Sequence, residues 1–162
     1  LGRERGQQLE QELLNAARPH TLRVVGPNCL GIMVPKVRLD ASFSPVRPRP
    51  GRLAFVAQSG AMATSVVDWA DARAIGFSHV VSLGDMADVD FGDMLDYLAN
   101  DGATRAILLY IESVTSARKF MSAARAAART KPVIAVKAGR HAAAARAAAS
   151  HTGALADRKS VV

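Results

Sequence analysis

The chain has 162 residues, 49% of them hydrophobic, which is enough for one globular domain with a real core. Its formal net charge is +7, but the basic residues are spread along the chain and few aromatic residues lie between them, so we expect no nucleic-acid partner. No apolar run approaches the ~18 residues that span a bilayer, so we expect no membrane segment. The single cysteine, Cys29, excludes an internal disulfide and favours a cytoplasmic protein.

The first 34 residues are predicted to be the end of a preceding α/β domain. The chain begins with Leu1 rather than methionine, so we expect it to be part of a longer protein. Residues 7–17 predict a helix with three leucines on one face, and residues 21–25 predict a short strand. A cluster of turn-forming residues follows at 26–31.

Residues 35–50 contain four prolines and predict an extended linker without regular structure. Proline fixes φ and lacks a backbone donor, so it is unsuited to the inside of a helix or sheet. The prolines are Pro35, Pro45, Pro48 and Pro50. We therefore expect the domain boundary and the first site of limited proteolysis to lie here.

From residue 51 onward the pattern alternates between apolar strands and amphipathic helices. Strands are predicted at residues 53–57, 79–83, 106–111 and 133–136. Helices are predicted at residues 60–75, after Asp90 and after Ser116, with Asp90 and Ser116 as N-caps. Apolar strands joined by crossover helices predict an α/β fold, a doubly wound parallel sheet with helices on both faces.

Polar residues follow the predicted strands, at the edge where an open α/β sheet binds ligands. Ser59 and Gly60 begin a helix, whose N–H groups and dipole suit a phosphate; the alternative is an ordinary N-cap serine. Glu112 ends a strand and can orient a histidine ring, or can be a solvated carboxylate. His151 lies in a polar loop after an alanine-rich run, where it is either an ordinary loop histidine or a reactive one. Together the three indicate a phosphohistidine site, and no metal site is expected.

Four short motifs resemble the NDP-forming acyl-CoA synthetase family, which includes the α subunit of succinyl-CoA ligase. They are Gly26-Pro27-Asn28-Cys29-Leu30-Gly31, Gln58-Ser59-Gly60-Ala61, Lys131-Pro132-Val133 and Ser150-His151-Thr152-Gly153-Ala154. The resemblance implies a CoA-binding Rossmann-like domain ending within residues 1–34 and a flavodoxin-like domain at residues 51–156. After Ala156 the sequence Asp157-Arg158-Lys159-Ser160 departs from the continuation expected of the family, so residues 157–162 are a tail assigned to neither domain.

The resemblance also implies a role for each candidate residue. His151 matches the phosphorylated histidine, Glu112 the carboxylate that steadies it, and Ser59 and Gly60 the helix end that holds the phosphate. Asn28 and Cys29 match the turn near the reactive end of CoA. The family reaction converts a carboxylic acid, CoA and ATP to acyl-CoA, ADP and phosphate. ATP or ADP with Mg²⁺ would be bound by an ATP-grasp domain that is absent from this sequence.

Two other functions compete with this interpretation. The same segments, and residues 84–91 in particular, resemble the synthetase-like half of bacterial lysine acetyltransferases that carry a GNAT domain. That resemblance implies a regulatory domain that binds acyl-CoA. A serine hydrolase is the third possibility, because Ser59 lies at a strand-to-helix turn. The residues two before and two after it, Ala57 and Ala61, are not the glycines of a nucleophile elbow.

Overall fold

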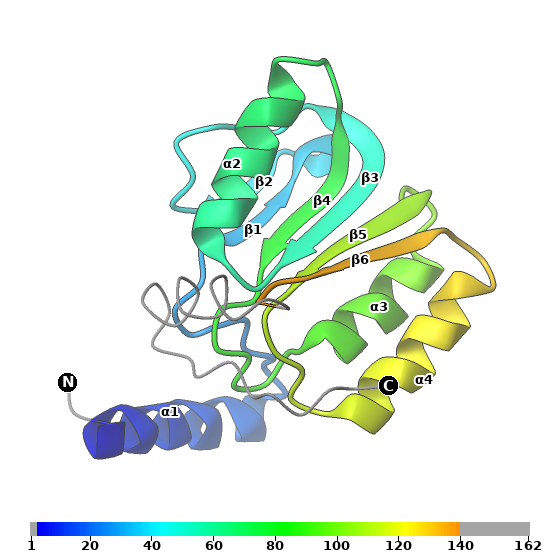
Figure 1. The fold of residues 1–162 in the computed structure, drawn as a ribbon. Coiled ribbons are helices and arrows are strands. Elements are labelled where there is room, and N and C mark those ends of the chain that lie inside the picture. The colour runs from blue at the N-terminus through cyan, green and yellow to red at the C-terminus, as the bar shows by residue number, and fades with distance from the viewer. Residues whose placement is uncertain (1–2, 140–162) are drawn as a thin grey trace.

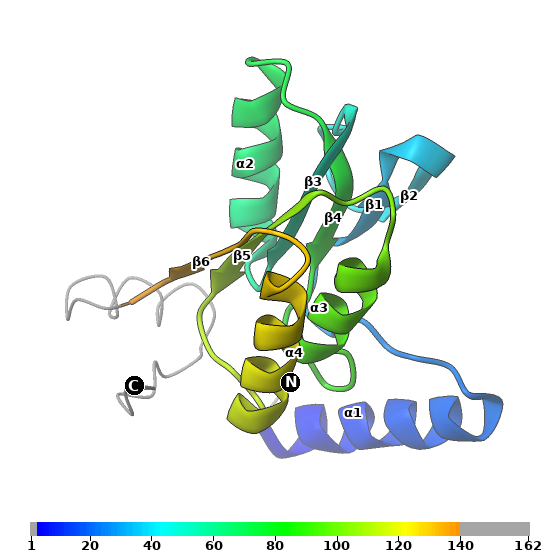
Figure 2. The same cartoon turned by 90° about the vertical axis from the view of Figure 1, so that its right-hand side faces the viewer.

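The structure, a computed structural model, describes residues 3–139 (Figures 1 and 2). The helices are α1 (Arg3–Ala17), α2 (Gly60–Asp71), α3 (Phe91–Asn100) and α4 (Ala117–Ala128), with the 3-10 turns η1 (Arg18–His20) and η2 (Pro35–Val37). The strands are β1 (Gly31–Val34), β2 (Leu39–Ser42), β3 (Pro50–Ala57), β4 (Phe77–Ser82), β5 (Ala106–Ile111) and β6 (Val133–Lys137). No helix within residues 3–139 combines the length and the apolar character needed to cross a membrane.

The six strands form one mixed sheet in the order β2-β1-β4-β3-β5-β6. Strand β3 is parallel to β4 and to β5, and β5 is parallel to β6. Counted within this parallel part, the strand order is 2-1-3-4, the flavodoxin-like order. The predicted α/β fold is confirmed, and the order reverses between β3 and β5.

The two faces of the sheet are covered by different helices, as Figure 2 shows. Side chains alternate along β3, so Ala54 and Val56 pack toward α3 and α4 while Phe55 and Ala57 pack toward α2. Strand β6, at the edge of the described sheet, is covered less than its apolar sequence predicts. Ile134 and Val136 are 58% and 48% exposed.

The N-cap residues of α2, α3 and α4 are the polar residues that the sequence offers for this role. Asp90 is the N-cap of α3, where its Oδ1 accepts from the backbone N–H groups of Gly92 and Asp93, while the Asp93 side chain accepts from Asp90 N. Ser59 caps α2 by accepting from Met62 N at 3.3 Å. Ser116 is the N-cap of α4 but makes no capping hydrogen bond through its side chain.

The predicted strand at residues 21–25 is wrong. These residues lie along a loop rather than beside a strand: Val24 N donates to Asp88 Oδ2 at 2.8 Å, and Val24 O accepts from Val89 N at 3.1 Å. Val24 is therefore bonded to a loop, by the side chain of Asp88 and the backbone N–H of Val89, and periodicity cannot distinguish such partners from a neighbouring strand. The helix predicted at 60–75 ends at Asp71, because Ala74 takes a left-handed φ of 55°.

The prediction that residues 35–50 contain no regular element is also wrong. Strands β1 and β2 form an antiparallel hairpin closed by η2, and β1 pairs with β4. Prolines restrict only their own positions, and none lies inside β1 or β2. Residues 43–49 do lack a helix or strand. The division of the chain into domains stays a prediction, but residues 31–34 and 39–42 are strands of the sheet.

Candidate functional site

A pocket of about 470 Å³ lies at the carboxyl ends of the parallel strands, next to the reversal in strand order. Five of the six predicted site residues line it: Asn28, Cys29, Ser59, Gly60 and Glu112. The sixth, His151, lies outside the described residues. The structure thus brings Ser59, Gly60 and Glu112 together at the edge where they were expected to meet, and the turn with Asn28 and Cys29 lies beside them.

The N-terminus of α2 forms one side of the pocket. Because the first N–H groups of an α-helix have no acceptor within the helix, those of Gly60 and Ala61 suit an anion in the pocket. Gly60 packs closely on the turn before β1: a Cβ at this position would lie 3.1 Å from the Leu30 Cβ. A larger residue here would therefore push that turn away from the helix.

The turn containing Asn28 and Cys29 forms another side of the pocket. Asp85 N donates to Pro27 O at 2.9 Å, and Asn28 Nδ2 donates to Asp85 Oδ1 at 3.3 Å. Gly84, with a φ of 57°, makes this contact possible, since a Cβ on it would come within 2.1 Å of Pro27 O. The turn is thus docked on the loop that follows β4.

Gln58, which follows β3, joins the end of this strand to the backbone that follows β5, at Glu112 and Ser113. Its Oε1 accepts from Glu112 N at 3.1 Å and from Ser113 N at 2.9 Å, and its Nε2 donates to Ser113 Oγ at 2.9 Å. The sequence alone predicted no role for Gln58. The available signal was its position directly after the first parallel strand, beside Ser59.

The negative charge of Glu112 affects the pKa of Tyr110, a nearby residue on β5. Burial, and then the negative charge of Glu112, raise the pKa of the Tyr110 phenol above its ordinary value. Tyr110 packs with the apolar cluster beneath α2. The Glu112 carboxylate thus lies near the face of the sheet that α2 covers, in the same pocket as Ser59.

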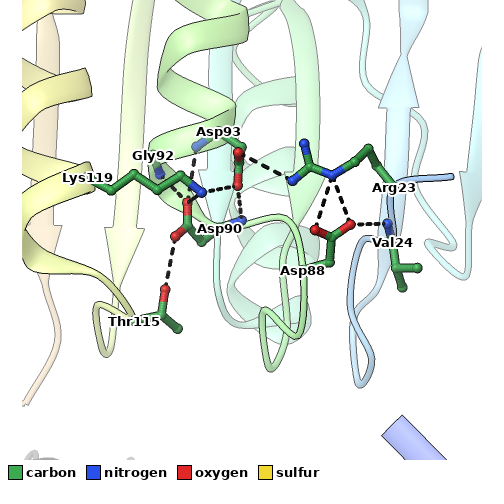
Figure 3. A network of polar contacts seen from close by, with 8 residues as sticks. All are labelled: Arg23, Val24, Asp88, Asp90, Gly92, Asp93, Thr115 and Lys119. Carbon is green, nitrogen blue, oxygen red and sulfur yellow. Dashed lines mark hydrogen bonds and ion pairs between the residues drawn. The ribbon is translucent and has the colours of Figure 1, made fainter. Parts of the chain in front are cut away.

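A network of charged side chains anchors the segment before the Asn28 turn (Figure 3). Arg23 binds Asp88 and lies 3.4 Å from Asp93, and Lys119 of α4 bridges Asp93 and Asp90. Burial raises the pKa of Asp93, but hydrogen bonds from Lys119 and from Asp90 N outweigh it and lower the pKa to about 2. The network connects this segment to the N-termini of both helices on one face of the sheet.

The other chemically suggestive groups do not favour a competing site. His79 is buried in β4, away from the pocket lining, and burial lowers its pKa, so the ring is neutral near pH 7. No histidine of residues 3–139 lines the pocket with Ser59, so the hydrolase alternative gains no support there. Nor do residues 3–139 contain a cluster of side chains suited to a metal ion.

The fold and the pocket define a flavodoxin-like α/β domain with a pocket lined by polar residues at the reversal in strand order. The chain belongs to the NDP-forming acyl-CoA synthetase family: the family model described as "Succinyl-CoA ligase like flavodoxin domain" matches residues 50–162.

Curated relatives and a solved structure agree with this assignment. The chain is 48% identical over 151 residues to acetate–CoA ligase [ADP-forming] I of Archaeoglobus fulgidus, a match that covers 93% of the chain and 22% of the relative. It is 44% identical over 153 residues to the α subunit of acetate–CoA ligase [ADP-forming] I of Pyrococcus furiosus, covering 94% of the chain and 33% of the relative.

A similar solved structure is acetyl-coenzyme A synthetase 1 of Ca. Korarchaeum cryptofilum in complex with phosphate and ADP. It has a TM-score of 0.82 and 40% identity, with 92% of this chain and 32% of that chain covered. The chain thus spans about a fifth to a third of the length of these proteins. None of the three is named as an acetyltransferase, so the resemblance to lysine acetyltransferases has no support from them.

Proposed function

We propose that this chain is the phosphohistidine-bearing part of an ADP-forming acyl-CoA synthetase. The observation that carries the proposal is the pocket in which the N-terminus of α2 and Glu112 meet at the carboxyl edge of the sheet. In the complete enzyme a carboxylic acid, CoA and ATP would give acyl-CoA, ADP and phosphate. Acetate is the first substrate to test, since two of the relatives are named for it.

In this proposal His151 carries the phosphoryl group between nucleotide and acyl group. Neutral imidazole is nucleophilic near pH 7, so a ring nitrogen attacks the terminal phosphorus of ATP and ADP leaves. The phosphoryl group then passes to the carboxylate oxygen of the acid, and the thiol of CoA displaces phosphate to form the thioester. Glu112 accepts the N–H of the other ring nitrogen and so holds the ring in one orientation.

The remaining pocket residues fit the charges in this scheme. The N–H groups and dipole at Ser59 and Gly60 offset the negative charge of the phosphoryl group. The similar synthetase of Ca. Korarchaeum cryptofilum was solved in complex with phosphate, which supports a phosphate ligand in this family. Asn28 and Cys29 lie at the pocket wall, where the reactive end of CoA would enter.

The cofactors and partners that we infer depend on parts of the enzyme outside this chain. Because it spans only part of its relatives, we infer that CoA and ATP or ADP with Mg²⁺ are held mainly by a CoA-binding domain and an ATP-grasp domain or subunit. A cytoplasmic location fits this substrate set. An attached GNAT domain belongs only to the competing regulatory function.

The test is phosphoryl labelling of the full-length protein. With ATP labelled in its terminal phosphate, or labelled phosphate plus acetyl-CoA, we expect an acid-labile, base-stable label. His151→Ala should abolish it and Glu112→Ala should reduce it, whereas the control His141→Ala should label normally. If the parent takes no label, or His151→Ala labels equally, the proposal is wrong and a regulatory acyl-CoA-binding domain becomes the better explanation.

A further inference from the structure

Gln58 occupies the point where three loops of the pocket meet. It is the first residue after β3, at the reversal in strand order. Its backbone N donates to Tyr110 O at 3.1 Å, and its backbone O accepts from Gly84 N at 3.1 Å. The main chain of Gln58 is thus bound to both neighbouring strand ends, those of β5 and β4.

The side chain of Gln58 continues this bonding beyond the last residue of β5, Ile111. Its Oε1 accepts from two successive backbone N–H groups, those of Glu112 and Ser113. Because both partners are donors, the atom facing them must be the amide oxygen, which assigns the nitrogen to Ser113 Oγ. The orientation of the amide is therefore determined by its partners.

These side-chain hydrogen bonds take the place of the backbone hydrogen bonds that β3 and β5 no longer form with each other beyond their ends. Beyond their carboxyl ends at a reversal in strand order, β3 and β5 lead to different loops, and a crevice opens between them. Without Gln58 the N–H groups of Glu112 and Ser113 would lose their acceptor. The backbone that carries Glu112 would then be free to shift relative to Ser59 on the opposite side of the pocket.

We propose that Gln58 is a positioning residue for phosphoryl transfer, whose side-chain amide ties β3 to β5 and so fixes Glu112 opposite the N-terminus of α2. This inference rests on the proposed function, in which Glu112 orients His151. Displacements of about 1 Å in such a site can cost about 100-fold in rate, so a bridge of this kind has a large effect without touching the substrate.

Two substitutions separate positioning from general stability. Gln58→Leu removes the one oxygen that accepts from both N–H groups, and it should slow single-turnover labelling of the full-length protein about 10- to 100-fold at every pH. Gln58→Glu keeps an oxygen for both N–H groups, and the Ser113 hydroxyl can rotate to donate to the other oxygen. It should therefore label at close to the parental rate at high pH.

Rescue of the labelling rate by Gln58→Glu is the readout for positioning, and the pH profile of this variant reports that residue 58 lies beside Glu112. A second carboxylate beside Glu112 raises the pKa of Glu112, so the acidic limb of the labelling rate should shift to higher pH. The other titratable groups around Glu112 include Tyr110, Asp85 of the pocket lining and Lys137, whose Nζ donates to Glu112 O. These groups are the same in parent and variant, so they cancel in the comparison.

Ser113→Ala is the matched control, because it removes only the hydroxyl partner and leaves both backbone hydrogen bonds to Gln58. Its labelling rate should stay within about threefold of the parent.

The positioning role is overturned if folded Gln58→Leu labels at the parental rate, or if Gln58→Glu, which keeps the acceptor, labels 10-fold or more below the parental rate at high pH. The second result decides even when Gln58→Leu fails to fold. In both cases a labelled parent leaves the proposed function standing, whereas an unlabelled parent overturns both.

Discussion

Arg23 binds Asp88 through both oxygens of the carboxylate, with its Nε 3.1 Å from Oδ1 and 3.0 Å from Oδ2. The pair joins the segment that leads to the Asn28 turn with the loop after β4. The hydrogen bond raises the pKa of Arg23 and lowers that of Asp88, so both partners are favoured in their charged forms. The pocket wall at Asn28 and Cys29 thus depends on a contact between residues 65 positions apart.

We predict that Asp88→Ala loosens residues 21–30 while leaving the sheet intact. The substitution removes the acceptor of Arg23 Nε and of Val24 N together. Amide hydrogen exchange should become faster in residues 21–30 and stay unchanged in β5. Asp40→Ala is the control, because its partner Arg47 is 85% exposed and the pair lies outside this segment. Equal exchange in parent and Asp88→Ala would show that the turn is held by other contacts.

We predict that Asp93→Asn lowers the free energy of unfolding by on the order of 2 kcal/mol at neutral pH. The folded-state pKa of Asp93 is depressed from 3.8 to about 2, so its stabilising effect is present above pH 3.8 and is lost as the pH falls through about 2. The difference between parent and variant should therefore shrink in acid. Urea midpoints measured from neutral pH down to about pH 2 test this.

The control for that series is Asp96→Asn, which changes an exposed carboxylate on the same helix. It should alter the urea midpoint little at any pH. A difference between Asp93→Asn and the parent that stayed constant across the pH range would mean that the charge of Asp93 is not what stabilises the fold.

We predict that Glu112→Gln lowers the pKa of Tyr110 without returning it to its ordinary value. Burial is the larger cause of the raised pKa and remains in the variant, while the charge of Glu112 is removed. Ultraviolet titration of the phenol in a Tyr97→Phe background of this chain isolates Tyr110, since the chain has two tyrosines. Asp96→Asn should leave the curve in place. If the titration curve of Tyr110 is unchanged in Glu112→Gln, the carboxylate lies too far from the phenol to affect its pKa.

We predict that Gly84→Ala destabilises the protein by at least about 2 kcal/mol. Its φ of 57° is left-handed, and the added Cβ would meet Pro27 O at 2.1 Å and Asn28 O at 2.4 Å. The matched control is Gly102→Ala, because a Cβ there would have no neighbour within 4 Å. Urea denaturation of both variants compares them directly. Similar midpoints for the two would contradict the close docking of the Asn28 turn on Gly84.

The parallel part of the sheet was predictable because its signals are local. Apolar runs bounded by turn residues mark β3, β4, β5 and β6 within two residues of their ends at all but one boundary, the start of β3. Asp90 was predictable as a cap because a capping carboxylate acts on its own helix. The meeting of Ser59 and Glu112 followed from a topological rule, since the carboxyl ends of parallel strands share one edge.

The sequence by itself thus determined the α/β class, the ends of the parallel strands and the meeting of Ser59 with Glu112, because periodicity, capping and parallel connection are properties of short stretches. Only the tertiary structure decided that the hairpin of β1 and β2 joins the sheet with β1 antiparallel to β4, that the Asn28 turn docks on Gly84, and that Gln58 bridges β3 and β5. These arrangements depend on which distant polar group satisfies a given N–H or C=O, and no local pattern encodes that choice.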